Sequence, residues 1–248
     1  MSRLVILSGP SCIGKSPLAR AIGKFHPELR ARLQEPVLYN CRDPRPGEVD
    51  GVTYHFRTRE HLESLRGQDG HIVLDVRRDV QALVTQDVRD ILDAGNSAFF
   101  EGNPYVAAAL MNDPSLQEFP TASVFMSPVC AAELRLLREK APGNVEKLIG
   151  DIMRRKLLRR TQRQKGVLSL RDLEDIEARC GAAYTELGYA HRFQYVLPNH
   201  DGEDSENWDA FYFPLGDARK CLLDFAAILR GDEPQFAESW ESDLVAEA

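Results

Sequence analysis

The sequence has few cysteines and no long apolar run. Its five cysteines are widely spaced with no C-x-x-C pair, so a disulfide framework is not indicated. No apolar segment is long enough to cross a membrane, and the first residues lack the charged-then-apolar pattern of a signal peptide. We therefore expect a cytoplasmic protein that keeps its thiols reduced and has no membrane partner.

An excess of basic charge is also missing. The 248 residues include 31 Lys and Arg against 38 Asp and Glu, a net charge of −7. This charge argues against nucleic-acid binding over the whole surface but leaves local basic clusters open. The length and the hydrophobic content of 43% are sufficient for one large α/β domain or two small ones.

The most informative stretch is Gly9-Pro10-Ser11-Cys12-Ile13-Gly14-Lys15-Ser16, which follows apolar residues 4–7 and precedes an amphipathic segment. This is the G-x-x-x-x-G-K-S pattern of a phosphate-binding loop (P-loop) between a strand and a helix. The two glycines let successive N–H groups face one concavity that holds phosphate oxygens. We expect Lys15 to reach the β- and γ-phosphates of a nucleoside triphosphate and Ser16 to bind Mg²⁺. The alternative is a glycine turn with a chance lysine.

Short apolar runs alternate with helical periods along the chain, which indicates an α/β fold with a doubly wound, mostly parallel sheet. Strands are expected at residues 4–7, 97–100, 122–126 and 195–197. Helices are expected at residues 16–25, 79–94, 129–138, 170–187 and 215–229. Ser169 and Asp172 form a capping pattern that marks the start of the fourth helix.

A second stretch, residues 40–56, carries Arg42 and Arg45 around a proline turn, followed by a short strand with Tyr54. Planar guanidinium groups held by a rigid turn match the oxygens of a phosphate. The alternative for this composition is a solvated, proline-rich surface loop. Taken alone, the stretch leaves both interpretations open.

The P-loop residues together with Arg42-Asp43-Pro44-Arg45-Pro46-Gly47-Glu48-Val49-Asp50-Gly51-Val52-Thr53-Tyr54-His55-Phe56 resemble the guanylate kinase family. The resemblance is strong to about residue 65 and weaker but collinear to about residue 199. It implies an ATP-dependent kinase that uses Mg²⁺ and acts on a small phosphorylated acceptor, with GMP the leading candidate. Arg42, Arg45 and Tyr54 would then bind the acceptor phosphate. The implied fold is a P-loop domain at residues 1–231 with an acceptor-binding insertion at about 37–76 and a helical lid at about 139–167.

The base-reading positions depart from the family pattern. Leu38 stands where the family usually has serine or threonine, and the family's base-reading glutamate falls near Val73, with Asp75 the nearest carboxylate. Two family aspartates correspond to Glu101 and Asn103. We expect Asp75 and Glu101 to contact the acceptor, although a strand-end glutamate is often only solvated. The departures keep another nucleotide or a phosphorylated ribose as rival acceptors.

Residues 144–165 form a basic amphipathic segment; among its cations are Arg154, Arg155, Lys156, Arg159, Arg160, Arg163 and Lys165. Three interpretations compete: a solvated helix face, a strip for RNA or DNA phosphates, and the lid of a nucleotide kinase. The absence of interleaved aromatic residues disfavours base stacking. The resemblance favours the lid and implies that Arg135, Arg154 and Arg155 offset the charge of the transferring phosphoryl group.

Residues 195–199 resemble the family's Y-x-x-V-N ending, which places Asn199 near the adenine of ATP. The acidic, polar residues 200–207 have no assigned role, and residues 232–248 are expected to be an acidic mobile tail. The alternatives to a kinase are a non-catalytic phosphate-recognising module and a nucleic-acid-binding ATPase. Intact Lys15 and Ser16 argue against the first of these.

Overall fold

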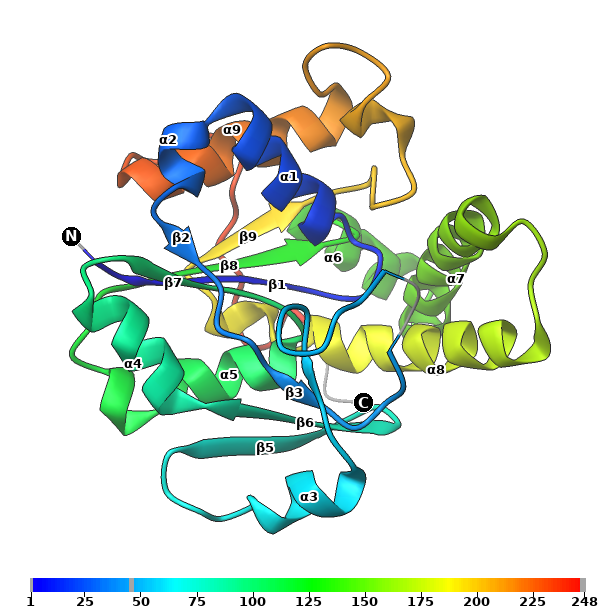
Figure 1. Cartoon of the computed structure of the whole chain (residues 1–248). Helices are drawn as coiled ribbons and strands as arrows, with labels where there is room; N and C mark the ends of the chain where they lie inside the picture. The colour runs from blue at the N-terminus through cyan, green and yellow to red at the C-terminus, as the bar shows by residue number, and fades with distance from the viewer. Residues whose placement is uncertain (1, 45–46, 246–248) are drawn as a thin grey trace. The chain divides into compact units, whose positions relative to one another are not determined.

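The computed structural model describes residues 2–44 and 47–245 (Figure 1). The chain forms two compact units. The first comprises the N-terminal residues up to Ile6 together with residues 32–121, and the second comprises residues 7–31 and the chain from Ala122 onward. Strand β1 (Leu4–Ser8) therefore carries the chain from the first unit into the second.

The first unit contains parallel strand pairing. Strand β2 (Leu33–Gln34) pairs in parallel with β7 (Ser97–Glu101), and β1 follows β7 in the strand order. Three helical elements belong to this part: α4 (Thr85–Asp93), α5 (Pro104–Asn112) and the 3₁₀ turn η1 (Pro114–Leu116). The strand predicted at 97–100 is confirmed, and its side chains are buried as expected when both faces of a sheet are covered.

The first unit also contains a four-stranded sheet with the order β4-β3-β6-β5. Its strands are β4 (His55–Phe56), β3 (Tyr39–Asn40), β6 (Asp79–Val84) and β5 (His71–Val76). Helix α3 (Arg59–Ser64) packs on one face through Leu62, which joins Val73, Val80 and Ala82 in a buried cluster. The sheet continues to residue 84, past the end predicted for the acceptor-binding insertion.

The helix predicted at 79–94 is wrong in its first part, because residues 79–84 form β6 and only Thr85–Asp93 are helical. Apolar residues in this segment fit either periodicity. The strand forms because β6 pairs along its whole length with β5 and also with β3, where Tyr39 faces Ala82. These antiparallel partners satisfy the backbone groups of β6 from both sides.

The second unit is built around strands β8 (Thr121–Ser127) and β9 (Tyr195–Pro198), which pair in parallel, with β1 next to β8 in the strand order. Helices α1 (Lys15–Phe25), α2 (Pro27–Arg30) and α9 (Gly216–Arg230) lie side by side (Figure 1). The remaining helical elements are α6 (Ala131–Lys140), α7 (Val145–Lys165), α8 (Leu170–Leu187), η2 (Ala190–Arg192) and η3 (Glu206–Trp208). The helices predicted near 16–25, 129–138, 170–187 and 215–229 are thus confirmed.

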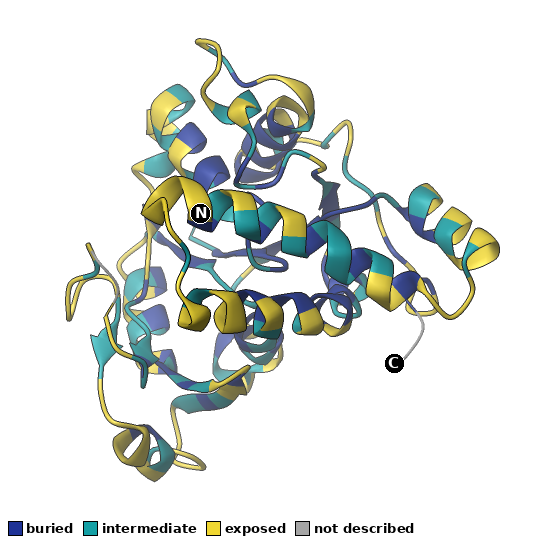
Figure 2. Cartoon of the chain, turned by 90° about the vertical axis from the view of Figure 1, so that its right-hand side faces the viewer, coloured by how far each residue is buried: buried dark blue, intermediate teal, exposed yellow. Residues whose placement is uncertain are grey.

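Helices α7 and α8 form a hairpin with a short connection (Figure 1). One stripe of α7, from Val145 through Ile149, Met153 and Leu157 to Thr161, is buried, and the opposite side of each helix is exposed (Figure 2). Ser169 caps α8 through a reciprocal capping box with Asp172, as the sequence predicts. The basic segment is therefore a helix with one packed face.

No helix in the described part of the chain has the length and apolar character needed to span a membrane.

The segment after Gly231 is packed, so the prediction of a mobile tail is wrong for residues 232–245. Glu238 and Val196 exchange backbone hydrogen bonds of 2.8 Å, which attaches the segment to β9. Trp240 is only 5% exposed, and its indole donates to Glu238 Oε2. Arg138 donates to the carbonyls of Asp243 and Leu244. Scattered apolar residues therefore anchor an acidic segment that lacks periodicity.

Replacing Trp240 by alanine is expected to destabilise the protein by about 2–4 kcal/mol, because the change removes a large buried ring and leaves a cavity. Chemical denaturation followed by circular dichroism measures the loss. Ser239→Ala, at an exposed neighbour, is the control and should change stability by less than about 0.5 kcal/mol. Equal stability of both variants would show that the segment contributes little to folding.

Candidate functional site

The phosphate-binding loop between β1 and α1 requires glycine at both of its fixed positions. Gly9 has φ +135°, and a Cβ there would lie 2.3 Å from the carbonyl oxygen of Met126. Gly14 has φ +109°, and a Cβ would lie 2.6 Å from Asn199 Nδ2. Contacts this short exclude any side chain. The loop therefore passes directly against the end of β8 and the residue that follows β9.

Lys15 lies over the loop that precedes it. Its Nζ donates hydrogen bonds of 2.8 Å to the carbonyl oxygens of Gly9 and Pro10. Ser16 follows in the first turn of α1, half-buried like Lys15. The side chain of Cys12 in the same loop is buried, and burial raises the pKa of its thiol to about 12, so it stays protonated and unreactive. The loop thus presents an amine and a hydroxyl at the start of a helix, the arrangement that binds phosphate.

The segment 199–208 supports this loop. Asn199 is fully buried, and its Nδ2 donates to the Ile13 carbonyl at 2.6 Å. The backbone N–H of Glu203 donates to the Cys12 carbonyl at 2.8 Å. Trp208 donates from its indole to the Gly202 carbonyl and lies near Gly14. The P-loop conformation is therefore held by residues almost two hundred positions away.

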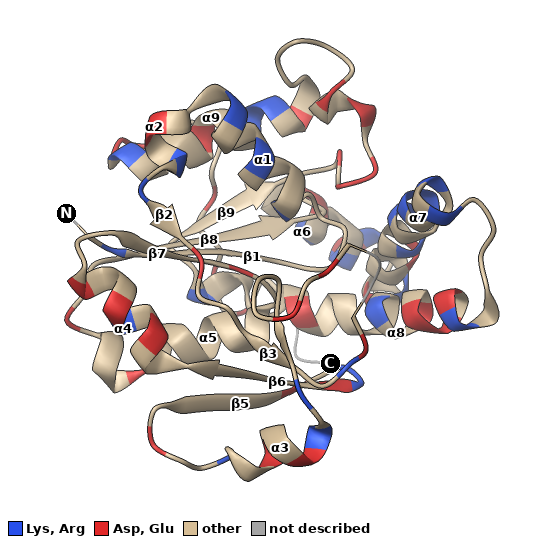
Figure 3. Cartoon of the chain, viewed as in Figure 1, with Lys and Arg blue, Asp and Glu red and all other residues tan. Residues whose placement is uncertain are grey.

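The same segment neutralises much of α7, and we call residues 200–206 the acidic loop. Carboxylates and carbonyls of the acidic loop face the cations of the helix, which gather along α7 in Figure 3. The ion pairs are Arg160–Glu203 at 3.2 Å, Arg163–Glu206 at 3.1 Å and Arg159–Asp204 at 3.8 Å. Lys156 donates to the carbonyl of His200, and burial lowers its pKa. The complementary charges of the two segments were the available sequence signal for this pairing.

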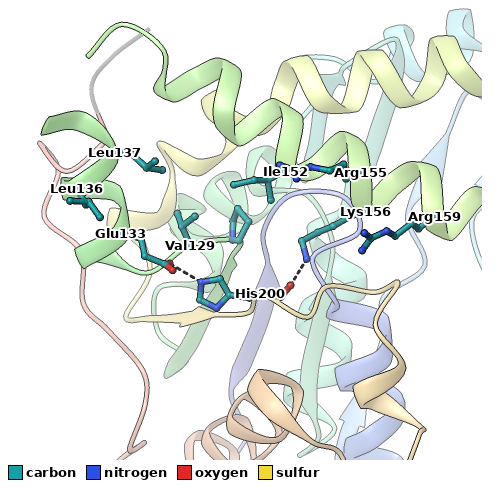
Figure 4. Close-up of a pocket in the computed structure, with 10 residues that line it drawn as sticks. Val129, Glu133, Leu136, Leu137, Ile152, Arg155, Lys156, Arg159 and His200 are labelled. Carbon is teal, nitrogen blue, oxygen red and sulfur yellow. Dashed lines mark hydrogen bonds and ion pairs between the residues drawn. The ribbon is translucent and has the colours of Figure 1, made fainter. Parts of the chain in front are cut away.

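A cavity of about 420 Å³ opens in the second unit beside His200 (Figure 4). Its wall is mostly apolar and comes from the end of β8, from α6 and from α7; the lining residues are Pro128, Val129, Glu133, Leu136, Leu137, Ile152, Arg155, Lys156, Arg159 and His200. An apolar cavity with a few polar groups at its edge is typical of a small-molecule site. His200, which lines the cavity, directly follows Asn199 in the sequence.

His200 lies between two carboxylates. Its Nε2 is 2.7 Å from Glu133 Oε2 on α6, and its Nδ1 is 2.5 Å from Asp217 Oδ2 on α9. Burial disfavours the charged ring, but hydrogen bonds to Asp217 and Glu133 outweigh it and raise the pKa of His200. A protonated His200 therefore ties β9 to two helices.

The predicted lid arginines separate in the structure. Arg135 on α6 is exposed. Arg154 turns toward α8, where it pairs with Glu177 at 2.7 Å, and it also pairs with Asp151 on its own helix. Arg155 lines the cavity, and its one hydrogen-bond partner among the described residues is the backbone carbonyl of Asp151. Of these three, Arg155 is the one at the candidate small-molecule site.

The first unit brings Arg42 and Tyr54 together. The Arg42 guanidinium lies 5.3 Å from the centre of the Tyr54 ring and 5.6 Å from that of Phe56. Its two terminal nitrogens donate to Glu48 at 2.7 and 2.6 Å. Burial opposes the charge of Arg42, but these bonds to Glu48 raise its pKa. Arg45 lies outside the described residues.

The predicted base readers fall in different places. Asp75 is exposed on the α3 side of β5, where it pairs with Arg66 at 3.1 Å, so it does not join Arg42 and Tyr54 on the other face of the sheet. Val73 belongs to the buried cluster under α3, and Leu38 is half-buried. Glu101 ends β7 and is half-buried. Because side chains alternate between the two faces of a strand, Asp75 does not lie with the other residues that the sequence predicts to bind the acceptor.

Raising the pH is expected to weaken the contribution of His200 to stability. Since its folded pKa lies above the ordinary 6.5, the stabilisation is present below that value and is lost as the pH rises through the folded pKa. The charged groups involved are Glu133, Asp217, Lys156 and Lys220, which pairs with Asp217.

Thermal unfolding at several pH values tests this for the native protein and for His200→Gln. We expect the Tm difference to be largest near pH 6 and to shrink toward pH 9, both rough limits set by the raised pKa. His191→Gln is the matched control, since the one hydrogen bond of that ring in the described part of the chain is to the carbonyl of Gly188. A Tm difference independent of pH would contradict the assignment.

Comparison with known proteins finds several guanylate kinases that are similar to this chain. The guanylate kinase of Clostridium perfringens (strain 13 / Type A) is 25% identical over 223 residues, which cover 89% of this chain and 85% of the relative. That of Synechococcus sp. (strain JA-3-3Ab) is 28% identical over 218 residues, covering 86% and 82%. The crystal structure of guanylate kinase from Anaplasma phagocytophilum matches with a TM-score of 0.50 and 20% identity over 81% of this chain and 78% of that one, which supports the fold.

The family model for guanylate kinase matches residues 1–176, well over half of the chain. This range contains both the phosphate-binding loop and the Arg42–Tyr54 pair. The protein therefore belongs to the guanylate kinase family.

Proposed function

We propose that the protein is an ATP-dependent kinase that transfers the γ-phosphoryl group of ATP to GMP. The observation that carries this proposal is the P-loop, whose Gly9 and Gly14 take positive φ angles and which places Lys15 and Ser16 at the start of α1, in a chain of the guanylate kinase family. Transfer by such kinases depends on positioning and electrostatic stabilisation, without a covalent intermediate.

The donor side is assigned to the second unit. The loop amides and Lys15 would hold the phosphates of ATP, with Lys15 giving up its bonds to the Gly9 and Pro10 carbonyls for phosphate oxygens. The cavity beside His200 is large enough for a nucleoside base. We assign this cavity to adenine. Asn199 would hold the P-loop through its hydrogen bond to the Ile13 carbonyl and would not contact the base directly. The orphaned Asn199 Oδ1 is buried and has no partner in the described part of the chain.

Magnesium would bind through the Ser16 hydroxyl, a hard oxygen ligand of the kind this ion prefers. No group of three or more His, Cys, Asp or Glu residues suited to a metal is present among the described residues. A single protein oxygen fits a metal that keeps waters and binds mainly to substrate phosphates. When bound, the ion neutralises phosphate charge.

The acceptor phosphate is assigned to Arg42. Glu48 occupies the Nη1–Nη2 edge of the guanidinium and Asp43 accepts a further bond from Nη1. Within the described residues no acceptor lies on the Nε–Nη2 edge, whose two parallel donors match two phosphate oxygens. We propose that Tyr54, stacked against the same group, and Arg45 complete the phosphate site. Glu48 thus orients the guanidinium that receives GMP.

Glu101 is proposed to accept hydrogen bonds from the guanine edge. Among the predicted lid arginines, Arg155 is the strongest candidate to offset phosphoryl charge, because Arg154 is already paired with Glu177. Arg135, exposed on α6, remains proposed in the same role. We also place the protein in the cytoplasm, since its cysteines are free and its proposed substrates occur there.

The pairing of α7 with the acidic loop bears on the rival nucleic-acid function. Phosphate backbones bind arrays of available cations, whereas Arg159, Arg160 and Arg163 each face a carboxylate of the same chain. The kinase assignment also uses the P-loop, which a purely phosphate-recognising module does not require. The geometry therefore favours catalysis over both alternatives.

A coupled ADP-release assay with magnesium-ATP tests the function. GMP is expected to give the highest turnover in a panel with dGMP, AMP, CMP, UMP, ribose phosphates and short RNA. ADP release driven by another acceptor would overturn the GMP assignment while keeping the kinase. No ATP binding by the native protein would overturn the kinase itself.

Arg42→Lys is expected to raise the KM for GMP by about tenfold or more, because lysine keeps the charge but loses the planar fork. The KM for ATP should change by less than about twofold, since the donor site is separate. Arg57→Lys is the matched control, as Arg57 is an exposed arginine that pairs with Asp50. Equal increases in both KM values for Arg42→Lys would contradict the division of the sites.

A further inference from the structure

Two polar side chains share the face of the four-stranded sheet that is turned away from α3. Asn40 on β3 pairs directly with Gln81 on β6, and Gln81 pairs with Leu74 on β5. Residues opposite one another in an antiparallel pair project to the same face. Val80 and Ala82, the sequence neighbours of Gln81, project to the other face and join Val73 of β5 in the cluster under α3. Asn40 and Gln81 are therefore not part of that core.

This face also leads to the proposed phosphate site. The Oδ1 of Asn40 accepts a hydrogen bond of 3.1 Å from the backbone N–H of Arg42. Gln81 is bonded at 2.8 Å to Asn103, which follows Glu101 by two residues. Gln81 thus lies between the strand that carries the phosphate-binding arginine and the residues that end β7. None of the family positions described above includes a glutamine here.

The orientation of the Gln81 amide follows from its partner. Asn103 caps α5, where its Oδ1 accepts from the backbone N–H of Val106 at 3.0 Å. Its Nδ2 must therefore be the group that faces Gln81, and it needs an acceptor. Gln81 supplies Oε1, which leaves its Nε2 with two N–H donors. Among the described residues Gln81 Nε2 has no hydrogen-bond partner, and the atom is accessible to solvent.

We propose that Gln81 is a specificity-determining residue that donates from Nε2 to O6 of guanine. The inference rests on the proposed GMP kinase function and deepens it. Guanine offers N–H donors at N1 and N2, which suit the Glu101 carboxylate, and an acceptor at O6, which suits Gln81. Adenine reverses this pattern, with an amino group at position 6 and a lone pair at N1. The Gln81 amide would thus supply the donor that is missing at Leu38, while Glu101 would supply the carboxylate that is missing at Val73.

The competing role for Gln81 is purely structural: its hydrogen bond to Asn103 connects β6 to the start of α5, and we call this the strut role. Gln81→Glu separates the two roles. Glutamate has the same shape and still offers an oxygen to Asn103 Nδ2, so a strut survives the change. It removes the N–H donors and faces guanine O6 with a carboxylate, so base recognition does not survive.

The experiment measures kcat and KM for GMP, AMP and ATP with the full-length native protein and with Gln81→Glu. We expect the ratio of kcat/KM for GMP over AMP to fall about tenfold or more, with the KM for ATP within about twofold. Gln34→Glu, an exposed glutamine of the same unit, controls for the added charge and should behave like the native protein. Thermal unfolding of all variants checks that they fold.

Gln81→Met provides a second, uncharged test. Base recognition predicts a lower GMP over AMP ratio for both Gln81→Glu and Gln81→Met, whereas a strut predicts an effect of methionine alone, visible as a lower Tm. A native GMP over AMP ratio in Gln81→Glu overturns the role of Gln81 and leaves the GMP kinase intact. If the native protein does not phosphorylate GMP, both the proposed function and the guanine contact fall.

Discussion

The contact between the P-loop and the segment after β9 is the constraint on which the donor site depends. A phosphate-binding loop needs a backbone path that only glycine adopts, and such a path is stable only when its outer side is filled. Here Asn199 and Trp208 fill the space beside Gly14, and Glu203 bonds the Cys12 carbonyl. The phosphate site is therefore encoded early in the chain but completed by its last quarter.

The same segment changes how the basic helix can act. A lid helix with free arginines would be drawn to any polyanion, while α7 has its charges divided between internal carboxylates and the cavity. The buried carboxylate of Asp204, with Glu203 and Glu206, holds the outer cations, and Arg155 remains at the cavity wall. Because paired charges are expensive to separate when partly buried, this arrangement favours one docked position of α7 and a small ligand over a polymer.

Local signals explain which elements could be predicted from the sequence. The strand–loop–helix of the P-loop, the cap at Ser169 and the apolar period of α9 each lie within one short stretch, and all three are confirmed. The helix prediction was wrong for residues 79–84 because their apolar pattern fits a helix or a strand. Pairing with Tyr39 and with β5, which is non-local, decides for the strand. The anchoring of Trp240 beside β9 is equally non-local. The position of Asp75 depended on strand register, where one residue decides the face.

The proposed acceptor site keeps the phosphate-binding residues of the family, while its proposed base-reading residues differ from the family pattern. Phosphate binding needs a positive charge in a fixed geometry, and Arg42, held by its ion pair with Glu48, would supply it. Base recognition needs only a pattern of donors and acceptors, which different residue types on neighbouring strands supply equally well. An amide held by a helix cap, as in Gln81 and Asn103, is such a substitute. It adds no negative charge near the acceptor phosphate, whereas a second carboxylate there would weaken GMP binding by repulsion.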